Sequence, residues 1–426
     1  MPLLSPFRAL RYPLDRIDDL SCVIAPPYDV ISPQQQERLY AASPHNVVRL
    51  ILGKQAATDT DADNRYTRAR RDFDAWQQAG ILQRDATPAF YLIEHTFRDK
   101  SQWSDRGDTP SDPAGGEGVE GPRTRLGFIA LLQFSDPIER AVYRHEATLA
   151  APKVDRTKLL EAIPASLEPI FCIYPDAGRV IQATLERLSA AAPIAEATMG
   201  DERVRMWAIT VPAELEAIRA RLATVAVLIA DGHHRFEVAY AHRHRYPALM
   251  AYFVSMDDPG LMIRPIHRLV RLKDATVLGA LHRVCETEPA GDLASLARWL
   301  NNGASANTGA RFGFYDGRGL YRAVVAQEPL VRWLMSPPVP LPVAQLDVSV
   351  LHGLVLPQLE VSQVTYHADI QEALQAVARG EAHGAWLLKG IPLAQVYALA
   401  SQGFTLPPKS TYFYPKVPSG LTMHLL

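Results

Sequence analysis

The feature that most constrains the fold is residues 225–243, where a short apolar run passes directly into a polar turn and then a helical pattern. Residues 225–230 are all apolar and rich in β-branched side chains, which is typical of a strand buried on both faces. After the turn, ring side chains recur every four residues and the first proline is Pro247. The stretch therefore predicts a buried strand, a tight turn and a helix.

The turn between this strand and helix consists of Asp231, Gly232, His233, His234 and Arg235. A helix that begins at the end of a buried strand presents its first N–H groups to an anion, and a glycine there allows a ligand to approach the backbone closely. The adjacent histidines project in different directions and cannot both bind one ion from the same face. Two interpretations stay open: a functional turn or a polar helix start.

A second polar group lies at residues 145–156 and contains His145, Glu146, Lys153, Asp155 and Arg156. Lysine and arginine neutralise phosphate oxygens, and carboxylates hold Mg²⁺ or accept a hydroxyl proton, so this composition suits phosphate chemistry. The alternative is an exposed helix start held by ion pairs at helical spacing.

The strand–DGHHR–helix sequence is similar to the signature of the ParB/sulfiredoxin-like fold, in which small α/β domains bind nucleotides. It most resembles the DUF 1015 family, some of whose relatives are free-serine kinases. Three further stretches carry the resemblance: APPYDVI at residues 25–31, HEATLAAPKVDRTKLL at 145–160 and PPKSTYFYPKVPSGL at 407–421. The resemblance implies an α/β protein with mixed sheets and a nucleotide-binding core with family-specific elaborations.

The resemblance also implies a function, a small-molecule kinase that moves a phosphoryl group from ATP or ADP, with Mg²⁺, to a hydroxyl such as that of free serine. A non-catalytic nucleotide-binding switch of the ParB-like type is the alternative, because the same residues would serve it. We assign catalysis to Asp231, Glu146, His233 and His234, with Asp231 and Glu146 also meeting the metal. Nucleotide binding is assigned to Gly232, Arg235, Lys153, Asp155, Arg156, His145, His267, Arg268 and Lys409.

Some of these residues have a structural explanation as well. His267 lies in an apolar run, where a histidine is more often a satisfied core residue, although a His-Arg pair is usual there in the resembled family. Tyr28 and Asp29 either form a turn before a helix or line a site. The tail around Lys409 carries three aromatics and rigid prolines, so we expect it to pack back onto the body.

The composition indicates which kinds of partner the protein can bind. The net charge of −2 gives no support to nucleic-acid binding, which normally requires a basic face. Three cysteines without CxxC spacing fit a reducing compartment, and no apolar run reaches the length of a membrane span. We expect a cytoplasmic protein that binds a nucleotide and a small hydroxyl-bearing metabolite, and no nucleic acid or membrane. The oligomeric state is left open.

The whole chain, residues 1–426, is expected to form a single family region. Sub-regions are expected at residues 1–175, 176–275 (the DGHHR core) and 276–426, with a flexible insertion at 100–125 that is poor in large apolar side chains. Local patterns predict a strand at residues 46–52, a helix at 275–287 and a meander of short strands at 312–333.

Overall fold

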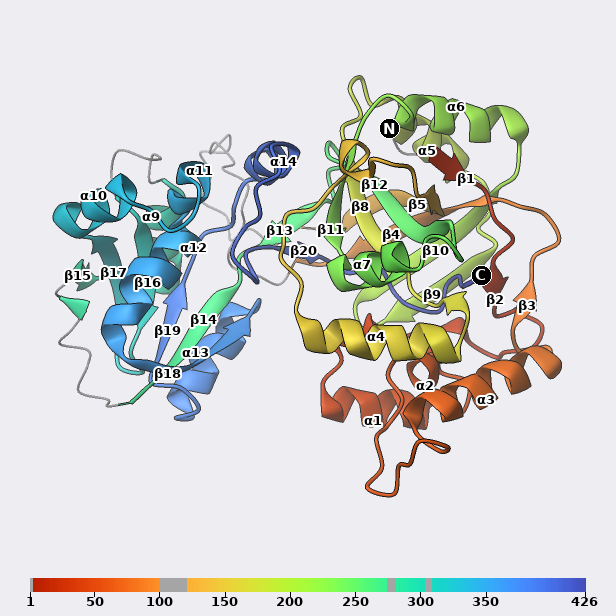
Figure 1. Ribbon diagram of the computed structural model, residues 1–426, viewed down its shortest axis with the longest axis horizontal. Helices are drawn as coiled ribbons and strands as arrows, with labels where there is room; N and C mark the ends of the chain where they lie inside the picture. Colours follow the sequence, from red (N-terminus) through yellow and green to blue (C-terminus); the bar gives the residue numbers. More distant parts are fainter. Residues whose placement is uncertain (1–2, 100–120, 274–280, 283, 303–308) are drawn as a thin grey trace.

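The computed structural model describes residues 3–99, 121–273, 281–282, 284–302 and 309–426. Figure 1 shows a larger body, which contains both ends of the described chain, and a smaller body beside it. The larger body is built on a nine-stranded sheet and the smaller on a six-stranded sheet. The chain is therefore mixed α/β, as the sequence predicts.

The large sheet runs in the order β6-β11-β8-β12-β5-β4-β10-β9, and β1 pairs with β5. β11 is parallel to β6 and antiparallel to β8, while β12 is parallel to β8 and antiparallel to β5, so the sheet is mixed. Its strands are β1 (Leu3–Ser5), β4 (Phe90–Phe97), β5 (Arg123–Gln133), β6 (Val142–Tyr143), β8 (Ile170–Tyr174), β9 (Ala195–Met199), β10 (Glu202–Ile209), β11 (Val227–Asp231) and β12 (Ala248–Ser255).

Helices cover the large sheet on opposite sides. In Figure 1, α5 and α6 lie at the top, and α1 to α4 lie below. The helices are α1 (Pro33–Ala42), α2 (Val48–Ile51), α3 (Arg65–Gln78), α4 (Ala150–Ala162), α5 (Val180–Leu188), α6 (Pro212–Leu222) and α7 (His233–Ala241). Two small ribbons, β2 (Leu10–Arg11) with β3 (Gln83–Arg84) and β7 (Ala165–Ser166) with β21 (His424–Leu425), complete this body.

The small sheet runs β15-β17-β16-β19-β14-β18. Its strands are β14 (His267–Leu272), β15 (Cys285–Pro289), β16 (Arg311–Tyr315), β17 (Leu320–Val325), β18 (Val361–His367) and β19 (Gly384–Leu387). The helices that follow in sequence are α9 (Leu293–Asn301), α10 (Gln327–Met335), α11 (Leu341–Ala344), α12 (Asp347–Val350), α13 (Ile370–Ala378) and α14 (Leu393–Ser401). β13 (Met262–Arg264) pairs with β20 (Tyr412–Tyr414) between the two bodies.

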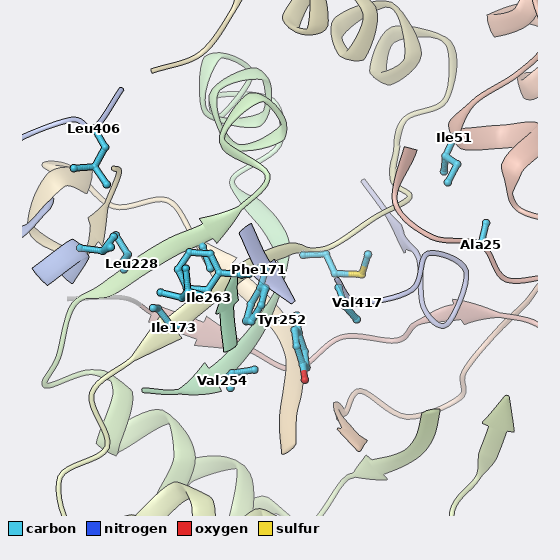
Figure 2. Close-up of a cluster of buried hydrophobic side chains, with 14 of the residues drawn as sticks. Ala25, Ile51, Phe171, Ile173, Leu228, Tyr252, Val254, Ile263, Leu406 and Val417 are labelled. Atoms are coloured by element: carbon cyan, nitrogen blue, oxygen red, sulfur yellow. The ribbon is translucent and has the colours of Figure 1, made fainter. Parts of the chain in front are cut away.

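The C-terminal tail packs back onto the large sheet, as its aromatics and prolines predict. Leu406 and Val417 share one apolar cluster with Phe171 and Leu228 of the sheet (Figure 2). Phe413 of β20 is 2% exposed and packs edge-on against Phe171. The tail is therefore part of the hydrophobic core.

The predicted strand–turn–helix at DGHHR is confirmed, with β11 ending at Asp231 and α7 beginning at His233. Gly232 between them has φ +92°, a conformation that residues with a side chain rarely adopt. A Cβ on Gly232 would lie 2.9 Å from the side chain of Ile170, so both backbone geometry and space require glycine.

Two local predictions are wrong, and a third is wrong at its end. Residues 46–52 form no strand, because Val48–Ile51 are the short helix α2, and just before it the side-chain amide oxygen of Asn46 accepts from the N–H of Val48. The helix predicted at 275–287 falls largely on residues 274–280 and 283, which lie outside the described residues, and only its end is wrong, because Cys285 begins the strand β15. The predicted meander at 312–333 contains only two strands, since α10 begins at Gln327, with a proline in its first turn, where no N–H partner is needed.

The flexible insertion expected at residues 100–125 falls on residues 100–120, which lie outside the described residues. Its last part is a correction, because Arg123 begins β5 and Arg125 is buried against the ring of Phe171. The boundary expected at residue 175 falls within the large sheet, since β8 lies before it in sequence, β12 lies after it, and the two are neighbouring strands of this sheet. Among the described residues no helix is long and apolar enough to cross a membrane.

If the tail is part of the core, Phe413→Ala will lower the free energy of unfolding by about 3–5 kcal/mol, the usual cost of removing a buried phenylalanine ring. Urea denaturation measures it. Met335→Ala is the control, because Met335 is 81% exposed and its loss should change little. A Phe413 variant as stable as this control would contradict core packing of the tail.

Candidate functional site

A cavity of about 210 Å³, partly open to solvent, lies where the DGHHR turn, the loop before α4, the tail and the small body meet. The loop before α1 closes it on another side. The residues that line it are Tyr28, Asp29, Val30, Glu146, Ala230, Asp231, Gly232, His233, His234, Arg235, Ile266, Tyr366, Ala368, Lys409, Thr411, Tyr412, Phe413 and Lys416. Three carboxylates and three strong cations therefore face one space.

Lys416 holds two of these carboxylates together. Its Nζ lies 2.7 Å from Oδ1 of Asp231 and also contacts Oδ2 of Asp29. Burial opposes the charge on Lys416, but the two carboxylates outweigh burial and raise the pKa of Lys416 above its ordinary value. The ammonium stays charged in the wall of the cavity.

Asp231 also accepts from Nη2 of Arg235 at 2.8 Å. Burial alone would raise the pKa of Asp231, but Lys416 and Arg235 together hold it below its usual value. Each carboxylate oxygen of Asp231 thus has a cationic partner, Lys416 on one side and Arg235 on the other. Asp231 is an ionised anchor for two cations and, in this arrangement, a weak proton acceptor.

Glu146 has a different environment. Its Oε1 accepts from the backbone N–H of Lys409 at 3.2 Å. Burial, with a contribution from Asp231, raises the pKa of Glu146 even though Lys409 opposes it. Of Glu146 and Asp231, Glu146 is the one whose pKa is shifted toward the range useful for proton transfer.

Arg268 does not line the cavity but contacts Lys409, which does. Its side chain is buried, and Nη2 donates to the carbonyl of Lys409 at 2.8 Å. Burial lowers the pKa of Arg268 to about 10. Lys409 has φ +59°, so its backbone is held in an uncommon conformation with its N–H on Glu146 and its carbonyl on Arg268.

The histidines form two kinds of contact. His145 and His233 pack with ring centroids 4.7 Å apart, and Nε2 of His145 lies 2.8 Å from the hydroxyl of Thr411. Burial lowers the pKa of His145 to about 4 and that of His233 well below its ordinary value. His234, whose pKa burial and Lys409 lower, accepts from the N–H of Leu149 at 2.9 Å. All three rings are neutral near pH 7.

Four predicted residues lie elsewhere. Lys153 pairs with Glu237 of α7, and Asp155 pairs with Arg65 and Arg156. The guanidinium of Arg156 lies 3.8 Å from the ring centroid of Tyr28, behind the cavity wall. His267 is buried in β14, where burial lowers its pKa to about 3. The structure thus brings Asp231, Glu146, Gly232, His233, His234, Arg235 and Lys409 together, with His145 and Arg268 directly behind them.

Sequence reasoning missed Lys416, Tyr366 and Glu168. Glu168 is buried beneath Tyr28, whose N–H it accepts at 3.2 Å, and it also accepts from the hydroxyl of Ser419. The only signal for Lys416 was its place in the aromatic tail, and Tyr366 lies in an unremarkable polar strand pattern. Across the described ranges, no group of three or more His, Cys, Asp and Glu side chains is arranged to hold a metal ion.

Comparison with known proteins identifies a family. The model of the family described as "Protein of unknown function (DUF1015)" matches residues 4–107 and 117–349. No curated protein matches.

Solved structures resemble the chain at low identity. A conserved hypothetical protein from Pyrococcus furiosus is 14% identical, covers 70% of this chain and 95% of its own, and has a TM-score of 0.36. A free serine kinase in complex with AMP is 14% identical, with 69% and 92% covered and a TM-score of 0.34. C-terminally truncated SbnI from Staphylococcus aureus is 10% identical, with 70% and 87% covered and a TM-score of 0.37. At these scores the likeness carries no functional argument.

If Lys416 neutralises Asp29 and Asp231, Lys416→Met will leave two partly buried carboxylates facing each other. The free energy of unfolding should then fall by about 3–5 kcal/mol, as when one partner of a buried ion pair is removed. Adding Asp231→Asn should recover part of the loss. Lys54→Met is the control, since Lys54 pairs with Glu37 at the surface. Equal urea midpoints for the two single variants would contradict the bridge.

The lowered pKa values of His145 and His233 predict acid sensitivity. An unfolded histidine takes up a proton below a pH of about 6.5, whereas the folded rings stay neutral to lower pH. The unfolded state therefore binds more protons, and stability falls as the pH drops from about 6.5 toward 4. In His145→Asn this dependence should be shallower, by at most about 1.4 kcal/mol per pH unit. Thermal unfolding across this range measures it, and an unchanged slope would contradict the assignment.

Proposed function

Because the chain belongs to the DUF1015 family, whose function is unknown, its activity has to follow from the site, and we propose that it is a phosphotransferase. It transfers a phosphoryl group from ATP or ADP to the hydroxyl of a small metabolite such as free serine. One observation carries the proposal: Glu146, with a raised pKa, faces the same cavity as Lys409, Lys416 and Arg235 at the N-terminus of α7.

The phosphates bind at the DGHHR turn. The first N–H groups of α7 have no partner within the helix and point along its axis, and the positive φ of Gly232 lets the chain turn directly from β11 into α7. Lys409, Lys416 and Arg235 supply positive charge around the same space. Phosphoryl transfer requires chiefly positioning and charge neutralisation, which this arrangement provides.

Glu146 accepts the proton of the acceptor hydroxyl. A general base works best when its pKa lies near the working pH, and the pKa of Glu146 is raised while that of Asp231 is lowered. The hydroxyl oxygen bonds to the terminal phosphorus of the nucleotide as the bond to the bridging oxygen breaks. The shortened nucleotide leaves with that electron pair, and the hydroxyl proton goes to Glu146.

Asp231 has a supporting role in this step. Its two oxygens hold Lys416 and Arg235, so it fixes both cations at the phosphate site. The same pairing fits poorly with direct binding of Mg²⁺ by Asp231, because both of its oxygens already face a positive charge. Neutralisation of the phosphates is therefore assigned to the cationic side chains.

A nucleotide-binding switch is the second candidate. The ionic bridge from Asp29 through Lys416 to Asp231 joins the loop before α1 to the DGHHR turn, and an added phosphate would compete for Lys416. Binding alone could then change how these segments contact each other. The two functions differ in whether a product forms that depends on the acceptor.

The central test is Glu146→Gln. With ATP or ADP, Mg²⁺ and a panel of hydroxy-amino acids, phosphorus NMR should show a phosphomonoester for the wild type. Turnover of the variant should fall by about 10²–10⁴-fold, the usual contribution of general-base catalysis. The nucleotide should still raise the melting temperature, because its phosphates contact other residues.

Glu139→Gln serves as the control, since Glu139 is an exposed carboxylate outside the cavity. If Glu146→Gln turns over at the wild-type rate, Glu146 is not the base. Nucleotide binding by the wild type without any phosphomonoester would reject the transferase for this panel and favour the switch.

A further inference from the structure

We propose that Tyr366, on the small body, is the stacking surface for the nucleotide base and that it makes the site prefer purines. This inference rests on the proposed function, because it takes the phosphates to bind at the DGHHR turn. It adds a specificity residue from a strand that the sequence analysis did not connect with the site.

Tyr366 is placed by the edge of the small sheet. It lies in β18, the edge strand, directly opposite Arg268 of β14 in the antiparallel register. Its side chain lines the same cavity as Asp231 and Lys409. The edge strand thus brings an aromatic ring to the mouth of a site that the large body builds.

Tyr366 is the aromatic side chain of the cavity with the most open surface. It is 40% exposed, whereas Phe413 is buried and Tyr28 and Tyr412 are half-buried. Tyr28 already has the guanidinium of Arg156 against its ring. A large exposed aromatic surface beside a charged cavity is the kind of surface on which a base can stack.

The ring of Tyr366 has two neighbouring side chains in the small body. The guanidinium of Arg268 lies 5.5 Å from its centroid, and the ring of His352 lies nearly parallel to it, 15° apart, at 6.4 Å. Arg268 and His352 are themselves joined, since Nε of Arg268 donates to Nε2 of His352 at 3.1 Å. A ring with such neighbours loses less freedom when a ligand stacks on it.

The residues around Tyr366 indicate which class of ligand the cavity suits. Ile266 and Ala368 line the cavity beside it and are apolar, while the charged side chains belong to the large body and the tail. An apolar, aromatic end and a cationic end in one cavity suit a molecule with a flat ring system and a phosphate chain. A purine offers more ring surface for stacking than a pyrimidine does.

Arg268 connects the two ends of this ligand. The same side chain lies against Tyr366 and donates to the carbonyl of Lys409, whose own side chain faces the phosphate region. The base would therefore rest on the small body and the phosphates on the large one. A bound nucleotide would span both bodies.

The test measures binding of ADP, UDP and inorganic pyrophosphate by titration calorimetry to the full chain and to Tyr366→Ala and Tyr366→Phe. Loss of one stacking contact should weaken ADP binding by about 10-fold in Tyr366→Ala. Pyrophosphate binding should be unchanged, and the preference of the wild type for ADP over UDP should shrink. Tyr366→Phe should bind like the wild type, because it keeps the ring.

Tyr321→Ala is the control for damage to the small sheet, since Tyr321 is a half-buried tyrosine of β17 outside the cavity. Equal weakening of ADP and pyrophosphate in Tyr366→Ala, or unchanged ADP binding, would overturn the stacking role and leave the proposed phosphate site standing. If the wild type binds neither pyrophosphate nor ADP, the phosphate site fails, and the stacking inference fails with it.

Discussion

The ionic bridge from Asp29 through Lys416 to Asp231 is the interaction on which the site depends. It joins three segments that are far apart in the chain: the loop before α1, the C-terminal tail and the end of β11. A buried charge is costly unless it is paired, and each of these groups is paired by the others. Lys416 can lie in the wall of the cavity as a charged group only because the tail also packs Phe413 and Val417 into the core.

Asp231 and Glu146, the two acids that the sequence indicated, differ in pKa because their surroundings differ. Asp231 and Glu146 line one cavity, but Asp231 has a cation on each oxygen and Glu146 accepts a backbone N–H. Nearby positive charge lowers the pKa of Asp231, while burial raises that of Glu146. One carboxylate thereby organises the cations, and the other is available to a proton.

The cations at residues 153–156 show how far composition can mislead. Lysine and arginine near a carboxylate suit phosphate binding, but the same composition suits ion pairs along a helix, and the structure has the latter arrangement. Lys153 pairs with Glu237 of the neighbouring α7, and Arg156 lies against Tyr28 with its charge balanced by Asp155. Tyr366 shows the opposite problem, because it lines the cavity although nothing in its local sequence pattern distinguishes it from any other residue of an edge strand.

The sequence by itself determined the order of elements around the DGHHR turn, because an apolar β-branched run, a glycine and a helical pattern are sufficient to specify a strand, a tight turn and a helix. It also determined that the aromatic tail packs onto the body. Only the tertiary structure decided which charges meet, since Lys416 and Asp29 lie 387 residues apart in the chain. Charged side chains have no periodic signature, and their partners are set by how the sheets and the tail pack together.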